Sequence, residues 1–268
     1  MSYEDRIFRR AIRVRRWFGV CTLTLAVGCP GPAPFVPDDA QLVFRDDFNA
    51  AMGLVEAGEY ETAAGRLQSL AEQGHAGAQF NLGYLYEAGR GVDQDFFAAF
   101  NWYRLAAAQQ RPDAEFKLGV MYYLGRGVGK DVEQAIEWYR RAAEQGYGNA
   151  QTNLAYAYQT GDGVDQDKRE AVAWYRKAAE QGSMKAQFNL GFLYLRGDGV
   201  DRQLVDAYKW FTLAAIQGHE QATRNRELVM RKMSESQLLT GDSSVRGYLE
   251  THPAFVRRLK ERKNQGPT

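Results

Sequence analysis

Cysteine is almost absent from this sequence of 268 residues. Its two copies, Cys21 and Cys29, both lie near the N-terminus, so the rest of the chain has no thiol for a disulfide or a thiolate metal site. The three histidines are spread out, and no His-Glu-x-x-His motif or acidic calcium loop is present. We therefore expect no metal site and no cofactor.

The chain also lacks a charge excess and a long apolar run. Its net charge of +1 gives no reason to expect a nucleic acid partner. That balance hides six arginines against two acidic residues in residues 1–28, so the remainder has a net charge of −3. The apolar run from Trp17 to Val27 is 11 residues long, whereas a helix needs roughly 20 to cross a bilayer.

Residues 1–28 read as an export signal, with a basic start, an apolar run and a segment of small residues before Cys29. This segment resembles a bacterial lipobox, in which Cys29 is acylated and becomes the mature N-terminus. An ordinary signal peptide or an uncleaved anchor is the alternative, and Arg15-Arg16 also resembles a twin-arginine signal. Pro30 stands where an Asp would favour the inner membrane. We expect a periplasmic lipoprotein anchored to the outer membrane by this lipid.

Four pairs of aromatic residues recur every 36 residues: Trp102-Tyr103, Trp138-Tyr139, Trp174-Tyr175 and Trp210-Phe211. Small and apolar residues keep helical spacing on both sides of a Gly-x-Gly-Val loop in every copy. Asp95, Asp131 and Asp167 stand where an N-cap belongs, and Gly146, Gly182 and Gly218 where a helix ends. A fixed period of this length predicts an array of helical hairpins that must stack to bury their apolar faces.

The frame A-x-x-x-L-G-x-x-Y-x-x-G-x-G-V-x-x-D-x-x-x-A-x-x-W-x-x-x-A-A resembles the Sel-1-like repeat family, relatives of the tetratricopeptide repeats. Four copies fill residues 78–221, with Ala155, Gln203 and Gln110 as departures. The resemblance implies an all-α fold, an α/α solenoid forming a right-handed superhelix of helix-turn-helix repeats. It also implies a scaffold that holds other proteins.

The flanking segments complete the domain plan. Residues 29–40 contain four prolines and read as an extended linker, and residues 41–77 as a tetratricopeptide-like starter hairpin. Residues 222–268 are expected to hold a capping helix over 222–233, a second helix from Ser234, a turn over 241–244 and a last helix from Pro253. The basic end of that helix is either a solvated face or a contact for an anionic surface or partner.

Signals of catalysis are missing. The Gly-x-Gly loops lack the third glycine and the preceding strand of a dinucleotide site, and no Ser or Cys stands in a nucleophile motif. The Trp-Tyr pairs have the register of core residues, although sugar stacking is the alternative. We expect a non-enzymatic scaffold in the cell envelope that binds a protein or peptide. The alternative is an envelope hydrolase acting on peptidoglycan or a β-lactam, as annotated for some members of the family.

The expected partner site follows from the first helix of each hairpin, which lines the concave face in related solenoids. Two positions three residues apart share one helical face there. Across the repeats, the first position is polar and the second is largely aromatic. The expected site residues at these two positions are Asn81, Tyr84, Lys117, Asn153, Tyr156, Asn189 and Phe192. Alternatively, the Asn amides bond neighbouring turns of the chain itself.

Overall fold

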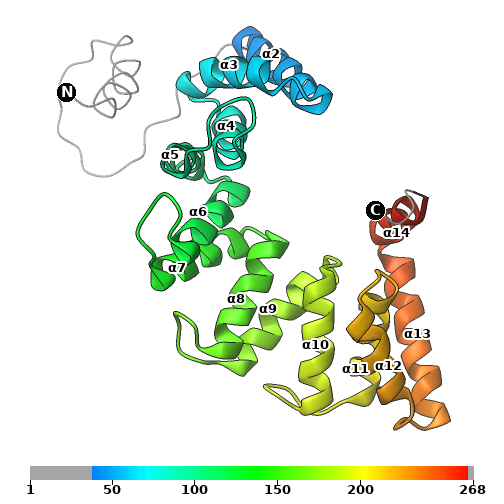
Figure 1. Cartoon of the computed structure of the whole chain (residues 1–268). Coiled ribbons are helices and arrows are strands. Elements are labelled where there is room, and N and C mark those ends of the chain that lie inside the picture. The colour runs from blue at the N-terminus through cyan, green and yellow to red at the C-terminus, as the bar shows by residue number, and fades with distance from the viewer. Residues whose placement is uncertain (1–37, 265–268) are drawn as a thin grey trace, which may run out of the picture. The chain divides into compact units, whose positions relative to one another are not determined.

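A computed structural model of the chain describes residues 38–264, and the side chains of residues 45–261. The expected signal peptide and Cys29 lie outside this range. Within it the chain forms thirteen helices and no strand (Figure 1), which confirms the all-α fold. None of these helices is both long and apolar enough to cross a membrane.

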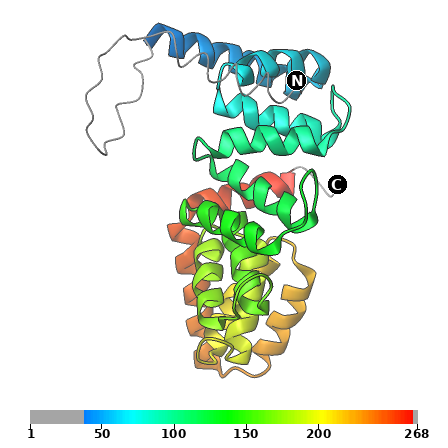
Figure 2. The same cartoon turned by 90° about the vertical axis from the view of Figure 1, so that its left-hand side faces the viewer.

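The described helices follow one another as hairpins along the chain (Figures 1 and 2). The helix that begins the chain in this range starts at Asp38, inside the stretch expected to be linker. The bounds are α2 (Asp38–Ala57), α3 (Tyr60–Glu72), α4 (Ala76–Ala88), α5 (Phe96–Ala107), α6 (Pro112–Leu124), α7 (Val132–Glu144), α8 (Gly148–Thr160), α9 (Lys168–Glu180), α10 (Met184–Arg196), α11 (Leu204–Ala215), α12 (Glu220–Met230), α13 (Glu235–Thr251) and α14 (Pro253–Asn264). Repeats 1 to 4 are the pairs α4/α5, α6/α7, α8/α9 and α10/α11.

The chain divides into two compact units. The first comprises the described residues up to Met121 together with Gly125–Gly129. In this unit α2 packs on α3, α3 on α4, and α4 on α5. Their shared core contains Leu67 of α3, Leu82 of α4 and Trp102 of α5. The starter hairpin and repeat 1 therefore share one apolar core.

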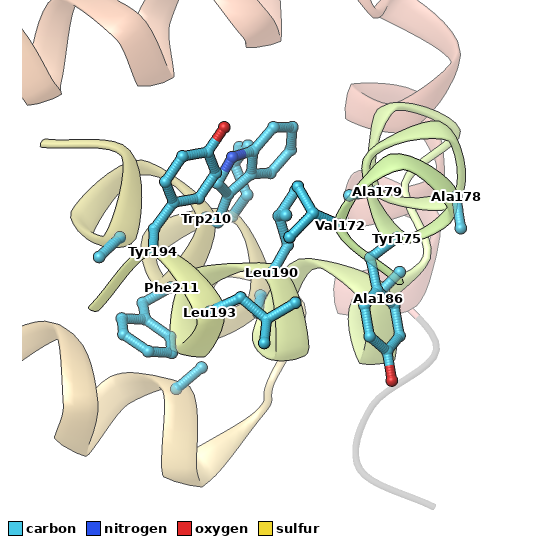
Figure 3. Packing of buried hydrophobic residues seen from close by; sticks show 14 of the residues in the cluster. Val172, Tyr175, Ala178, Ala179, Ala186, Leu190, Leu193, Tyr194, Trp210 and Phe211 are labelled. Carbon is cyan, nitrogen blue, oxygen red and sulfur yellow. The ribbon is translucent and has the colours of Figure 1, made fainter. Parts of the chain in front are cut away.

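The second unit comprises Tyr122–Leu124 and the chain from Lys130 onward. Here each first helix packs against the second helix of its own repeat and of the preceding one, as α10 does against α11 and α9. Figure 3 shows Leu190 and Leu193 of α10 in the same cluster as Tyr175 of α9 and Phe211 of α11. Burying each such side chain contributes about 1.5–3 kcal/mol, so contacts within a hairpin and with the preceding hairpin both stabilise it.

Predicted helix starts are confirmed at the three aspartates. Asp95, Asp131 and Asp167 each accept a backbone N–H of the following helix at 2.8–3.0 Å. Gln203, at the equivalent place in repeat 4, makes no such side-chain bond. Ser234 and Gln237 form a complete capping box, and α14 begins at Pro253.

The aromatic pairs differ from the prediction that every Trp fills the core. Trp102 and Trp210 are buried, at 8% and 4% exposure, but Trp138 and Trp174 are half-buried. The second member of each pair, Tyr103, Tyr139, Tyr175 or Phe211, is buried in all four repeats. A cation covers each half-buried ring, with Arg141 Cζ 4.6 Å from the centroid of Trp138 and Lys177 Nζ 3.8 Å from that of Trp174.

The turn expected at residues 241–244 is wrong, because these residues lie inside α13. Gly241 is buried against α11, where a β-carbon on it would lie 2.6 Å from Cδ1 of Tyr208. The Tyr208 hydroxyl also donates to Asp242 Oδ1 at 2.7 Å. The glycine therefore marks a close helix–helix approach and not a turn.

Candidate binding site

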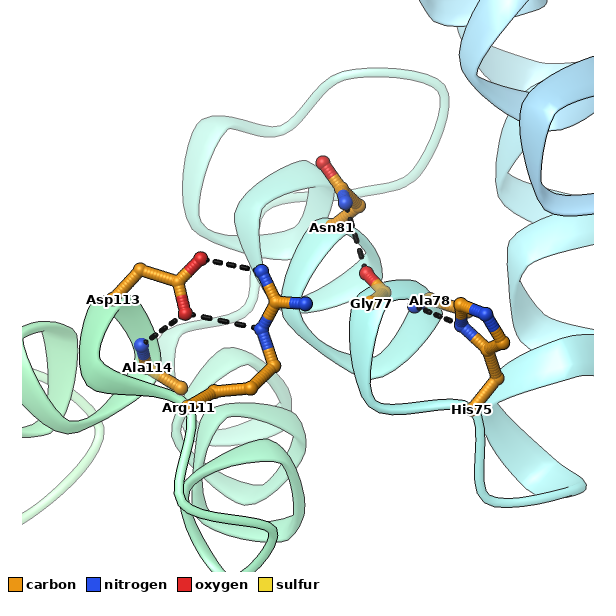
Figure 4. Close-up of polar contacts among 7 residues, drawn as sticks. All are labelled: His75, Gly77, Ala78, Asn81, Arg111, Asp113 and Ala114. Atoms are coloured by element: carbon orange, nitrogen blue, oxygen red, sulfur yellow. Dashed lines mark hydrogen bonds and ion pairs between the residues drawn. The ribbon is translucent and has the colours of Figure 1, made fainter. Parts of the chain in front are cut away.

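The expected site residues of the first unit lie on α4 and α6, and their polar groups are engaged within the unit. Asn81 Nδ2 donates to the Gly77 carbonyl at 2.8 Å (Figure 4). Lys117 Nζ donates to Glu87 Oε2 at 2.8 Å and lies 5.7 Å from the ring centroid of Tyr84. Lys117 is thus held by a partly buried ion pair, which limits its use for a partner.

The Glu87 carboxylate also accepts a second hydrogen bond in this unit. The Tyr103 hydroxyl donates to Glu87 Oε2 at 2.6 Å. Burial, and then this hydrogen bond to a carboxylate, raise the pKa of Tyr103 far above its usual value. The phenol therefore stays protonated, and the cluster is a structural link between α4, α5 and α6.

Figure 4 also shows how the first helices begin in this unit. His75 Nδ1 accepts the backbone N–H of Ala78 at 3.0 Å. Arg111 pairs through its guanidinium with Asp113 and covers the ring of Phe80, with Cζ 5.3 Å from the centroid. The residue in front of each first helix thus also contacts the preceding repeat.

In the second unit the amides of the expected site bond tyrosine hydroxyls of the preceding repeat. Asn189 Nδ2 of α10 donates to the Tyr175 hydroxyl of α9 at 3.1 Å. Asn153 of α8 bonds the Tyr139 hydroxyl of α7 in the same way, although burial still raises the pKa of Tyr139 to about 12. These amides therefore contact the chain itself, as the alternative interpretation held, but through side-chain hydroxyls and not through turns.

A hollow of about 280 Å³ opens beside these amides, on α8, α10 and the start of α12. It brings together three of the expected site residues, Asn153, Tyr156 and Asn189, and leaves out Phe192, whose ring lies under Arg196. Tyr156 is 53% exposed, so its ring is accessible beside the hollow. The full lining is Thr152, Asn153, Tyr156, Lys185, Phe188, Asn189 and His219.

Sequence reasoning missed four of these lining residues: Thr152, Lys185, Phe188 and His219. Phe188 and His219 stack across the junction of repeat 4 and α12, with ring centroids 4.3 Å apart. His219 Nδ1 accepts the Ala222 N–H at 3.2 Å, so this ring also caps α12. The available signal was a break in the 36-residue period at Thr152, where the other repeats have Phe.

Sequence reasoning also missed a buried glutamine in the first helix of repeats 1, 3 and 4, where repeat 2 has Glu115. Gln79, Gln151 and Gln187 are almost completely buried, and each Nε2 donates to a carbonyl near the end of the preceding second helix. Each side-chain oxygen accepts from a second glutamine 30 residues later. These amides are satisfied within the protein and hold adjacent repeats together.

The glycines of the Gly-x-Gly-Val loops are also explained by packing. Gly199 has a φ of 72° and lies against the backbone carbonyl of Lys168, at the start of the second helix of repeat 3, where a β-carbon would clash. Among the described residues, no three His, Cys, Asp or Glu side chains are grouped so that they could hold a metal ion.

Comparison with protein families matches the Sel1 repeat to residues 76–110, 112–147, 148–183 and 185–219. A solved Sel1 repeat protein from Oxalobacter formigenes is 41% identical over 62% of this chain and 48% of that chain, with a TM-score of 0.59. A protective antigen with an SLR fold, present in uropathogenic Escherichia coli strains, is 31% identical over 85% of this chain and 50% of that chain, with a TM-score of 0.72. The match thus spans about half the length of both structures. No curated protein matches the chain.

Proposed function

The chain belongs to the Sel1 repeat family, whose members are generally non-catalytic protein-interaction scaffolds, and we propose that it binds a protein partner at the hollow on α8, α10 and α12. The observation that supports this proposal is the exposed ring of Tyr156 beside two amides and a lysine. A few residues provide most of the binding energy in protein interfaces, and tyrosine is enriched among them.

The open shape of the hollow favours a segment of protein over a cofactor. Pockets for whole small molecules usually measure about 300–1,000 Å³ and enclose most of the ligand. At about 280 Å³ and open to solvent, this hollow suits one or two side chains of a partner that also covers its rim. Tyr156 and Lys185 are exposed on that rim, where a partner can contact them.

Site-specific cross-linking tests the proposal. A photoreactive phenylalanine analogue replaces Tyr156, and the matched control carries it at Arg169, an exposed residue of α9 outside the hollow. We expect a defined partner to be cross-linked from position 156 and not from position 169. Equal cross-linking from both positions would contradict the proposal, as would hydrolysis of nitrocefin or release of muropeptides by the purified chain.

We further propose that the scaffold acts in the bacterial envelope as a lipoprotein attached through Cys29. The support is the sequence of residues 1–29, with its basic start, apolar run and terminal cysteine. That the similar Escherichia coli protein is a protective antigen agrees with export. Fractionation of a Cys29→Ala variant tests this: we expect loss of membrane attachment and a change in electrophoretic mobility. A variant that fractionates and migrates like the parent would show that Cys29 is not acylated.

A further inference from the structure

One side chain of each first helix faces the next repeat. Its position is two residues after the alanine that begins the repeat frame, and three of the four repeats have phenylalanine there: Phe80, Phe116 and Phe188. Repeat 3 has Thr152 instead. The residue 31 positions later precedes the next first helix, and it is Arg111, Tyr147, Ser183 or His219. Repeat 3 therefore has two small hydroxyl residues where the others have a ring and a large partner.

The contacts show what the missing ring does elsewhere. Phe188 stacks on His219 at 4.3 Å between centroids and packs on Phe211 at 5.9 Å. Phe80 makes the equivalent contacts, with Arg111 over its ring and Tyr103 at 5.5 Å. At this position a phenyl ring thus fills the space between two repeats.

Repeat 3 leaves that space open. Thr152 Oγ1 donates to the Gly148 carbonyl at 2.8 Å and lies 3.2 Å from Ser183 Oγ. These short side chains satisfy each other, and neither reaches as far as the phenyl ring of the other repeats. Thr152 lines the hollow described above, whose wall includes the ring of Phe188. The hollow therefore opens beside the one repeat position that has a short side chain in place of phenylalanine.

The charge beside the hollow is positive. Lys185 is exposed on the rim, and no carboxylate in the described part of the chain forms an ion pair with it. Lys117 of the first unit, which has the repeat position of Asn153 and Asn189, is instead paired with Glu87. Asn189 uses one of its two amide protons on Tyr175, which leaves a donor and a carbonyl for a peptide backbone.

We propose that the hollow receives an aromatic side chain of the protein partner, with an acidic residue next to it contacting Lys185. This inference rests on the proposed scaffold function and names the chemistry of its ligand. The partner's ring lies between Thr152 and Phe188, in the room that the short side chain of Thr152 leaves. Exposed Tyr156 covers the inserted ring, and the amides of Asn153 and Asn189 bind the backbone on either side.

Three blocked dipeptides test this chemistry on the isotope-labelled full-length chain: acetyl-Phe-Glu-amide, acetyl-Phe-Lys-amide and acetyl-Ala-Glu-amide. Their affinities are measured from the movement of amide NMR signals of the hollow. We expect the Phe-Glu probe to bind at least tenfold more tightly than the Ala-Glu probe, and more tightly than the Phe-Lys probe. Equal affinity of the Phe and Ala probes, or no signal movement with any probe, overturns the proposal. Equal saturation by free phenol would show a small-molecule site and overturn it too.

Thr152→Phe fills the hollow with the residue that the other repeats use, and Thr160→Phe places the same ring at an exposed site of α8. We expect the first variant to lose Phe-Glu affinity at least tenfold and the second to keep it. Lys185→Glu should reverse the preference between the Glu and Lys probes. Full affinity in a folded Thr152→Phe chain overturns the proposal. If that variant does not fold, the Phe and Ala probes on the parent chain decide.

The two proposals fail separately. Cross-linking of a partner from position 156 by a chain that does not bind the dipeptides would support the scaffold function and refute the aromatic ligand. Dipeptide binding without any cross-linked partner would refute the scaffold function and leave the aromatic site.

Discussion

Gln217 Nε2, just after the end of α11, donates to Gln187 Oε1 of α10 at 2.8 Å within repeat 4. Gln187 Nε2 in turn donates to the Ala179 carbonyl at 3.0 Å, so one completely buried amide connects α9, α10 and the end of α11. A buried amide is tolerated because its donor and acceptor are both used. The same connection at Gln79 and Gln151 fixes how successive repeats stack.

Replacing one of these buried glutamines should lower the unfolding free energy of the chain. Gln151 is the cleanest case, because Gln187 also contacts Tyr248. Gln151→Leu leaves the Ala143 carbonyl and the Gln181 amide without this partner. We expect a loss of about 1–3 kcal/mol of unfolding free energy, measured by urea denaturation. Exposed Gln221→Leu is the control, and an equal effect of both substitutions would contradict the role of the amide.

The two members of an aromatic pair should differ in their contribution to stability. Tyr175 is completely buried, so Tyr175→Ala should cost about 3–5 kcal/mol through the cavity it leaves. Trp174 is half-buried under Lys177, so Trp174→Ala should cost less than about 2 kcal/mol. Trp138→Ala should resemble Trp174→Ala. A greater loss from Trp174→Ala than from Tyr175→Ala in chemical denaturation would contradict this order.

Two glycines of α13 provide a matched test of the helix–helix approach. Gly241→Ala puts a methyl group 2.6 Å from the Tyr208 ring and should cost about 1–3 kcal/mol through overpacking. Gly247 has no atom within 4 Å of the added carbon, so Gly247→Ala should stabilise the helix by about 0.4–1 kcal/mol. Thermal unfolding of both variants measures the difference. Effects of the same sign would show that Gly241 is not closely packed.

His75 should make stability depend on pH. Burial first, and then the charge of Arg111, lower the pKa of His75 below its usual value of about 6.5. Its contribution is therefore complete above that value and is lost as the pH falls towards the folded-state pKa, because the unfolded chain takes up the proton more readily. His75→Ser, which keeps a capping oxygen as Ser183 does at α10, should weaken this dependence.

Urea unfolding of the parent and of His75→Ser at pH 7.5 and pH 5 measures this effect. The difference between the two chains should stay within about 1 kcal/mol, the usual value of one N-cap. An unchanged pH dependence in the variant would assign it to other groups.

Only part of the candidate site could be predicted from the sequence. Asn153, Tyr156 and Asn189 line the hollow and were found by comparing one helical face across the repeats. The same comparison grouped them with Lys117, which Glu87 holds in an ion pair. Aligning the repeats by sequence treats equivalent positions as if they had the same surroundings. In the structure, the side chains of the adjacent repeats differ from one position to the next.

The sequence by itself determined the helical hairpins, their 36-residue period and the helix starts at Asp95, Asp131 and Asp167. These features depend on residues a few positions apart, through capping bonds and helical spacing. Tertiary structure alone decided which aromatic of each pair is buried, why Gly241 lies inside a helix and where the hollow opens. Adjacent residues of a helix point about 100° apart, so the angle at which repeats pack chooses between Trp174 and Tyr175. The hollow likewise opens beside Thr152, whose short side chain bonds Ser183, 31 residues later, where the other repeats have a phenylalanine.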